Sequence, residues 1–128
     1  MSESNRELGK VQGVRLYRED RGVLTLSVQI EFRSGTQAFG GIQLDRWDDK
    51  KSRRVGTSAG TDLICRLLDL FNVATLDKIQ GRYVYGLREA SGGSIVGLEL
   101  PEPDGGGKFL LSEWNADAER VEKNPSKG

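Results

Sequence analysis

The chain has 128 residues, of which 19 are basic and 19 acidic, with no histidine and a single cysteine, Cys65. This length fits one domain built on one hydrophobic core, and a net charge of zero provides no overall field to attract nucleic acid or an anionic membrane. The absence of histidine excludes catalysis by a histidine-containing dyad or triad and removes the commonest zinc ligand.

One cysteine allows neither an internal disulfide nor a multi-cysteine metal site, so the sequence is compatible with a reducing compartment. With no histidine to act as its base, Cys65 is predicted to be inert. No apolar run approaches the roughly 20 residues that a membrane span needs, and the first ten residues are mostly polar. We therefore expect a cytoplasmic protein without membrane attachment.

Residues 1–10 are predicted to form a flexible N-terminal arm because they are mostly polar and charged. A first strand is expected from Val11 to Glu19, where the apolar residues Val14 and Leu16 alternate with more polar side chains. The sequence E-D-R-G, which ends at Gly22, is typical of a tight turn. The first strand should therefore form a hairpin with the next one.

The strongest pattern in the chain runs from Val23 to Arg33, where apolar and polar residues alternate. The apolar set is Leu24, Leu26, Val28, Ile30 and Phe32, and the polar set is Thr25, Ser27, Gln29, Glu31 and Arg33. This alternation predicts a strand with one face buried in the core and the other face in water.

A third strand is predicted from Gln37 to Asp45, with Ala38, Ile42 and Leu44 on one side. The pair Gly40-Gly41 interrupts it. Paired glycines inside a strand mark either a β-bulge or a place where another backbone or a ligand approaches closely. The bulge is the favoured interpretation, and the alternative makes both glycines candidate partner-binding residues.

Residues 46–61 are polar and are predicted to be the least regular part of the chain. An amphipathic helix is predicted from Asp62 to Asn72, where apolar residues recur at the spacing of one helix face. They are Leu63, Ile64, Leu67, Leu68, Leu70 and Phe71. This helix is expected to cover the apolar face of the sheet, and Asp62 and Arg66 are spaced to form an ion pair on its outer side.

The second half of the chain contains two further predicted strands. A single helical turn is expected from Thr75 to Ile79, and strands from Arg82 to Glu89 and from Ser94 to Leu100 are joined by the hairpin loop A-S-G-G. Residues 101–107 should form a flexible acidic loop, and residues 108–114 a last strand or a short helix.

These elements predict an α+β fold, with an antiparallel β-sheet in β-β-β-α-β-β order and one main amphipathic helix packed on one face. A single domain is expected over residues 11–114. The tail, residues 115–128, is charged and poor in apolar residues, so it is predicted to be disordered.

The segment before the predicted helix has the composition of an anion pocket. A helix N-terminus presents unpaired amides and the positive end of the helix dipole. The candidate ligand-binding residues there are Arg53, Arg54, Thr57, Ser58, Gly60 and Thr61. The spacing is not that of a Walker A loop, because Gly56 and Gly60 are four apart and no lysine follows. The alternative is that these residues only cap the helix on a solvated loop.

Trp47 is a further candidate ligand-binding residue, because an aromatic side chain among cations can stack on a base. Three aspartates interleaved with those cations, Asp45, Asp48 and Asp49, argue against a nucleic-acid groove and favour a loop laced with salt bridges. The same carboxylates suit a magnesium ion. No nuclease signature accompanies them, and we predict no metal site and no cofactor.

Tyr83 and Tyr85 are two residues apart and therefore share one face of their predicted strand. Such pairs are typical of sheet packing or of a protein interface. Tyr83 is accordingly a candidate partner-binding residue and Tyr85 a candidate ligand-binding residue. Trp114 is predicted to be a core residue or an oligomer contact, and it joins Gly40 and Gly41 in the candidate partner-binding set.

Three segments resemble a group of small tailed-phage proteins of unassigned role: G-V-L-T-L-S-V-Q-I from Gly22, A-F-G-G-I-Q-L-D from Ala38 and R-V-G-T-S-A-G from Arg54. The resemblance covers residues 11–88, and the F-G-G and L-D elements are the most particular. The chain departs from the group at Ile42, where an aromatic residue is common, and in its late glycine-rich loop. The resemblance implies a phage accessory protein that acts inside a bacterium, and it supplies no catalytic residues.

Three functional hypotheses follow. The leading one is a non-catalytic binding protein, a phage counter-defence factor that docks on a host immune protein in the manner of an anti-CRISPR inhibitor. The alternative is a protein that sequesters a phosphorylated nucleotide signal through residues 53–61. The third and weakest is an enzyme that uses the aspartates and a metal. Strong general nucleic-acid binding is not expected, and the sequence leaves homo-oligomerisation open.

Overall fold

The computed structural model describes residues 5–89 and 93–123. Its strands are β1 (Arg6–Arg18), β2 (Leu24–Phe32), β3 (Gly35–Gln43), β4 (Asp45–Asp48), β5 (Arg53–Gly56), β6 (Tyr83–Arg88), β7 (Ile95–Glu99) and β8 (Lys108–Leu110). Its helices are α1 (Ser58–Phe71) and α2 (Leu111–Lys123), with short 3-10 turns η2 (Asp20–Gly22), η3 (Leu76–Ile79) and η4 (Glu102–Asp104).

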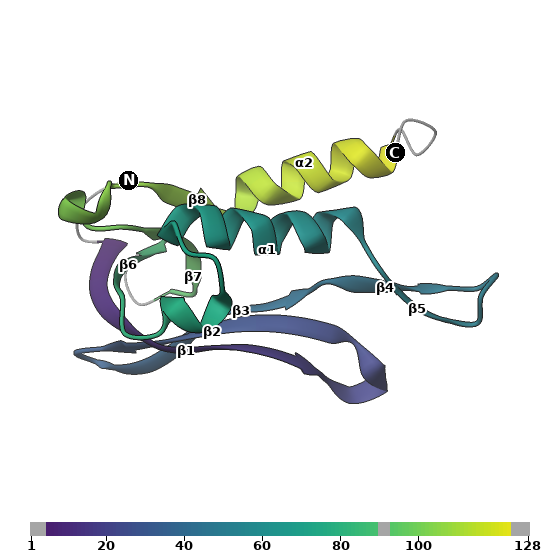
Figure 1. Cartoon of the computed structure of the whole chain (residues 1–128), viewed down its shortest axis with the longest axis horizontal. Coiled ribbons are helices and arrows are strands. Elements are labelled where there is room, and N and C mark those ends of the chain that lie inside the picture. The colour runs from purple at the N-terminus through teal and green to yellow at the C-terminus, as the bar shows by residue number, and fades with distance from the viewer. Residues whose placement is uncertain (1–4, 90–92, 124–128) are drawn as a thin grey trace.

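Six of these strands form one antiparallel sheet in the order β3-β2-β1-β6-β7-β8, and β4 and β5 form a separate hairpin. Helix α1 covers one face of the sheet, and α2 lies on α1 and against β7 and β8 (Figure 1). This is the predicted α+β class, with its antiparallel sheet and its main helix. Helix α2 is a second helix, and it extends beyond the strand or short helix predicted over residues 108–114.

Strand β1 begins at Arg6, so the predicted flexible arm is wrong for residues 6–10. These residues pair with β6 in an antiparallel ladder. The apolar signal of a strand is weak here because a core-facing position is occupied by Gly9, where a Cβ would lie 2.6 Å from Cγ2 of Ile30. Residues 1–4 of the predicted arm lie outside the described residues.

The alternating stretch forms β2, and its apolar face is the centre of the core, as predicted. Leu26, Val28 and Ile30 are fully buried. The side chains of α1 that are buried in the same core are Leu63, Leu67 and Phe71. On the opposite face Thr25 and Ser27 are buried as well, so that face is not wholly in water. Their side chains are short, and β2 lies between two other strands.

The glycine pair forms the predicted β-bulge. Leu26 pairs with Ile42 and Ser27 pairs with Gly40, which leaves Gly41 as the extra residue of β3. Both glycines have positive φ values, 130° and 69°, and a Cβ on Gly40 would lie 2.7 Å from the carbonyl oxygen of Leu26. The pair is therefore required by the local backbone.

The bulge reverses the alternation of β3. Phe39 before it and Ile42 after it both face the core, and Leu44 continues on that side. Ala38 is exposed. The prediction that Ala38 shares a face with Ile42 is wrong, because the extra residue shifts the two-residue period by one.

Residues 46–61 are regular, contrary to the prediction. Most of them belong to the antiparallel hairpin of β4 and β5, whose turn includes Ser52 at a φ of 52°. Helix α1 then begins at Ser58, earlier than predicted, with Thr57 as its N-cap residue. It ends near the predicted position, with Asn72 in the left-handed conformation.

Strands β6 and β7 agree with the predicted ranges, and residues 90–92 of the predicted loop between them lie outside the described residues. The predicted strand or short helix over residues 108–114 contains β8 and the start of α2. The disorder predicted for the tail is wrong over residues 115–123, which continue α2. Residues 124–128 are not among those described.

A tryptophan and an ion pair hold α2 to α1. Trp114 is 9% exposed and belongs to the core, and its indole Nε1 donates a 2.8 Å hydrogen bond to the carbonyl oxygen of Ala59. Arg66 of α1 also forms an ion pair with Asp117 of α2 and, at 2.7 Å, the predicted pair with Asp62. These contacts explain why a segment with few apolar residues is helical.

Candidate functional site

Arg54, a central residue of the predicted anion pocket, is bound within the protein. Its Nη2 lies 2.9 Å from Oδ1 of Asp45, whose side chain is 4% exposed. Asp45 also accepts a 3.1 Å hydrogen bond from the amide of Leu24. The hydrogen bond from Arg54 holds the pKa of Asp45 below its ordinary value of 3.8, against the opposing effect of burial. This pair joins the base of the β4–β5 hairpin to β2.

The first turn of α1 is likewise capped by a side chain of the protein itself. The hydroxyl of Thr57 accepts a 2.9 Å hydrogen bond from the amide of Gly60 and donates one of 3.0 Å to the carbonyl oxygen of Leu44. Gly60 is buried, and a Cβ on it would lie 2.7 Å from Cα of Leu44. Thr57 and Gly60 therefore fix the junction of β3 and α1, whereas Ser58 and Thr61 are exposed.

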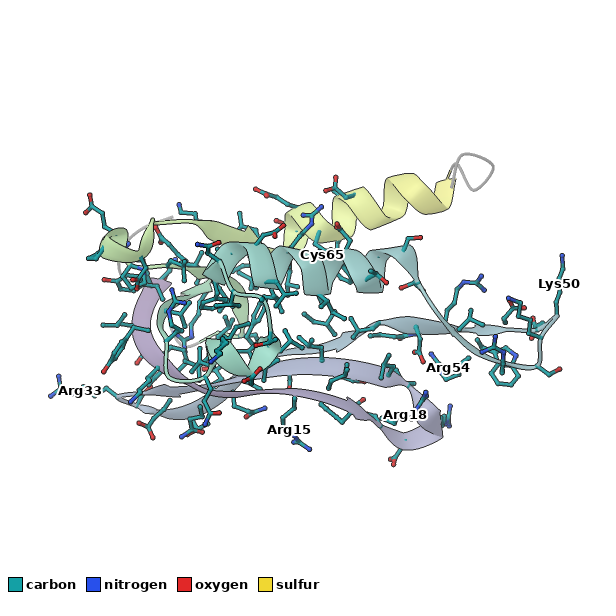
Figure 2. The ribbon with its side chains drawn as sticks, viewed as in Figure 1. Arg15, Arg18, Arg33, Lys50, Arg54 and Cys65 are labelled. Carbon is teal, nitrogen blue, oxygen red and sulfur yellow. The ribbon has the colours of Figure 1, made fainter. Side chains whose placement is uncertain are left out.

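The β4–β5 hairpin projects from the body of the molecule (Figure 1) and carries Lys50 at its tip (Figure 2). Trp47 is 54% exposed on it, and its indole donates a 2.8 Å hydrogen bond to Asp49. Asp48 accepts hydrogen bonds from the backbone amides two and three residues further on. These two aspartates therefore stabilise the hairpin turn. Arg53 is exposed on the same hairpin.

The candidate ligand-binding residues do not converge on one position. Trp47 is on β4 and Tyr85 is on β6, and Figure 1 shows these strands at opposite ends of the long axis. The two rings therefore cannot contact the same base. In addition, Arg54 and Thr57 already have partners within the chain.

The candidate partner-binding residues divide into structural and exposed positions. Gly40 and Gly41 form the bulge in β3, and Trp114 anchors α2 to α1. Each of these three residues thus has a role within the fold that accounts for it. Tyr83, in contrast, is 52% exposed.

Tyr83 belongs to a group that we call the tyrosine face, which lies on the side of the sheet opposite the core. Its members come from β1 and β6: Arg6, Leu8, Lys10, Tyr83 and Tyr85. Leu8 is 47% exposed. The guanidinium carbon of Arg6 lies 4.1 Å from the ring centroid of Tyr85, and Nζ of Lys10 lies 5.9 Å from that of Tyr83. Each ring thus has a cation over one of its faces.

Arg88 has several side-chain contacts across the sheet, and no sequence pattern indicated its role. It is 6% exposed and points into the core side of the sheet, where its guanidinium lies 5.0 Å from the ring centroid of Phe32. It forms a 3.0 Å ion pair with Glu7 and donates hydrogen bonds to Gln37, at 2.7 Å, and to the carbonyl of Gly93, at 2.9 Å. Because these partners come from four segments, Arg88 ties the curved sheet together.

Comparison with known proteins assigns no family, since no family model, curated protein or solved structure matches the chain. Within the described ranges no helix is long and apolar enough to cross a membrane. The same residues contain no group of three or more carboxylate or thiol side chains placed to hold a metal ion.

Asp45→Asn is expected to lower the free energy of unfolding by about 2 kcal/mol at neutral pH, because it replaces the carboxylate of the ion pair with Arg54 by a neutral amide. The pKa of Asp45 is lowered by folding, so its stabilising contribution is present above the ordinary value of 3.8 and is lost as the pH falls through the folded-state pKa. Urea unfolding of both proteins at neutral and at acid pH checks this. A difference that did not shrink in acid would contradict it.

Proposed function

We propose that this chain is a non-catalytic binding protein that docks on another protein through the tyrosine face. The observation that carries the proposal is the pair of tyrosines with stacked cations beside Leu8, on a sheet surface that neither helix covers. Tyrosine and arginine are enriched at the centres of protein interfaces, where they supply most of the binding energy.

The geometry of the tyrosine face favours a protein partner over a polyanion. Arg6 already stacks on Tyr85 and forms a 3.4 Å ion pair with Glu99 of β7, so its charge is partly balanced within the protein. Stacking and pairing also restrict these side chains before binding, so less side-chain conformational entropy is lost when a partner binds. The result is a largely preformed surface of mixed charge.

The partner class that we propose is a host immune protein in a bacterial cell, as the resemblance to phage proteins implies. A counter-defence factor of this kind acts by occupying a surface of its target and needs no chemistry of its own. The nucleotide-binding alternative has less geometric support, because Arg54 and Thr57 are engaged within the chain and Trp47 and Tyr85 are far apart.

The experiment is a phage plating assay in a panel of bacterial strains, each carrying one defence system. We expect the wild-type chain to restore plating of a targeted phage in one strain, and Tyr83→Ala to weaken binding to the inhibited component by about 30-fold, the effect of losing about 2 kcal/mol at an interface. Purified components and titration calorimetry give the second measurement.

Trp47→Ala is the matched control, because Trp47 is an aromatic residue of similar exposure on β4 and lies outside the tyrosine face. It should retain plating and affinity. Failure of the folded wild-type chain to inhibit any system in the panel, or equal affinity of Tyr83→Ala and the wild-type chain, would refute the proposal.

A further inference from the structure

Strand β1 has one paired half and one open half. Residues 6–10 pair with β6 on one side, and Gly9 and Lys10 also pair with β2 on the other. The last contacts to the β6 side are the backbone hydrogen bonds of Val11 with Gly81 and Arg82. From Gly13 to Arg18, β1 pairs with β2 only. Within the described residues no strand pairs with the other edge of this stretch, and η3 is the element that lies near β1 there.

The pairing pattern indicates which backbone groups face that edge. At the turn the amide of Glu19 donates a 2.9 Å hydrogen bond to the carbonyl of Val23. Antiparallel pairs alternate between hydrogen-bonded and non-hydrogen-bonded positions. Alternate residues therefore direct their amides and carbonyls away from β2, and these are Val14, Leu16 and Arg18.

On the core side of the sheet this edge carries Val14, Leu16 and Arg18, and on the other side it carries Arg15 and Tyr17, so each face has one cation. Leu16 lies opposite Leu26 on the core side of the sheet, yet it is 52% exposed. Arg15 and Arg18 are both exposed, and Figure 2 shows Arg15 directed away from α1 and Arg18 at the β1–β2 turn. The stretch from Gly13 to Arg18 contains two arginines and no acidic residue.

We propose that this edge binds an extended acidic segment of a partner protein, which adds a strand beside Gly13–Arg18. Backbone hydrogen bonds to the open amides and carbonyls would supply affinity, as in other cases of strand addition. An apolar residue of the added strand covers Leu16, and its carboxylates face Arg15 and Arg18 on the two faces of the sheet.

Charge complementarity selects this occupant over a second copy of the chain. Two copies paired through this edge would place four arginines in one short ribbon, and positive charge on an edge strand is a known device against self-pairing. The proposed site is also separate from the tyrosine face, which belongs to the paired half of β1. Either proposal can therefore fail without the other.

The test uses the full chain and a fluorescein-labelled peptide with the sequence Glu-Thr-Val-Glu-Val-Thr, blocked at both ends. In antiparallel register its glutamates face Arg18 and Arg15, and its first valine faces Leu16. Fluorescence anisotropy gives the affinity. Amide hydrogen exchange reports protection of Leu16 and Arg18 when the peptide is bound. A peptide with lysine in place of glutamate and one with methylated backbone nitrogens serve as probe controls.

We expect the acidic peptide to bind and to protect the amides of Leu16 and Arg18. Arg15→Glu combined with Arg18→Glu, and separately Leu16→Lys, should each weaken binding by about tenfold or more. Leu8→Lys is the matched control, since it changes a leucine of similar exposure in the paired half of the same strand, and it should bind the peptide as the wild-type chain does.

Several results would overturn the inference. One is equal binding of the acidic, basic and methylated peptides, and another is loss of binding in Leu8→Lys but not in Leu16→Lys. Sedimentation of a dimer that Leu16→Lys dissociates would show that a second copy occupies the edge. Absence of amide protection under saturating acidic peptide would also exclude strand addition.

Discussion

Arg88→Met is expected to lower the free energy of unfolding by about 3 kcal/mol, and thus the melting temperature by roughly 10 °C. The substitution keeps much of the aliphatic volume but removes the ion pair with Glu7, the hydrogen bonds to Gln37 and Gly93, and the cation over Phe32. Gln37 and Gly93 are then left without the donor that satisfies them, which adds to the cost.

Chemical denaturation and calorimetry measure the effect, with Arg33→Met as the matched control. Arg33 is an exposed arginine at the end of the β2 strand region (Figure 2), and its replacement should change stability by less than about 0.5 kcal/mol. Arg88→Lys should fall between the two, because an ammonium keeps the charge but cannot reach several segments at once. Equal stability of Arg88→Met and Arg33→Met would show that Arg88 does not hold the sheet.

Gly60→Ala is expected to destabilise the protein by about 3 kcal/mol, although alanine normally favours a helix over glycine by about 1 kcal/mol. The reason is the close approach of α1 to the end of β3. A Cβ on Gly60 would lie 2.7 Å from Cα of Leu44 and closer still to its carbonyl oxygen. Because that neighbour is backbone, the helix itself has to move.

Gly56→Ala is the control for this prediction. Gly56 does not have a positive φ, and no atom lies within 4 Å of a Cβ built on it. Its replacement should leave the urea midpoint almost unchanged. A stabilising Gly60→Ala would mean that helix propensity outweighs the contact and that α1 does not pack closely on Leu44.

Strands β2 and β3 and most of β1 could be predicted because their patterns are local. The alternation in β2 alone identifies the strand and its buried face. The face of Ala38 could not be assigned by the same rule, since the rule assumes an unbroken period of two. Recognising a bulge at Gly40-Gly41 was not sufficient; its extra residue has to be counted before the remaining side chains are assigned.

The β4–β5 hairpin and the extent of α2 could not be predicted from hydrophobic pattern, because both segments are rich in charged residues. The hairpin strands have only four residues each, which is too short for alternation to stand out among charges. Asp48, which binds the amides of the turn, is the signal that was available. For α2 the signal was a series of good helix formers after Trp114.

In the candidate site, too, features set by neighbouring residues could be predicted, and features set by contacts between distant segments could not. Spacing alone placed Tyr83 and Tyr85 on one face. The cations above them come from β1, and their position depends on a register between segments more than seventy residues apart. The partners of Arg54 and Arg88 are likewise set by the assembled fold, so no sequence pattern marks them.

The central place of β1 in the sheet has a consequence for how the chain folds. Its contacts with β2 are close in sequence and can form as soon as the first hairpin has been synthesised. Its contacts with β6 close a loop that extends from Arg6 to Leu87, so the sheet is completed only after most of the chain has left the ribosome. The pairing of β1 with β6, which joins strands β1–β3 to strands β6–β8, should set the folding rate. Until that pairing forms, both halves of β1 remain accessible to other chains.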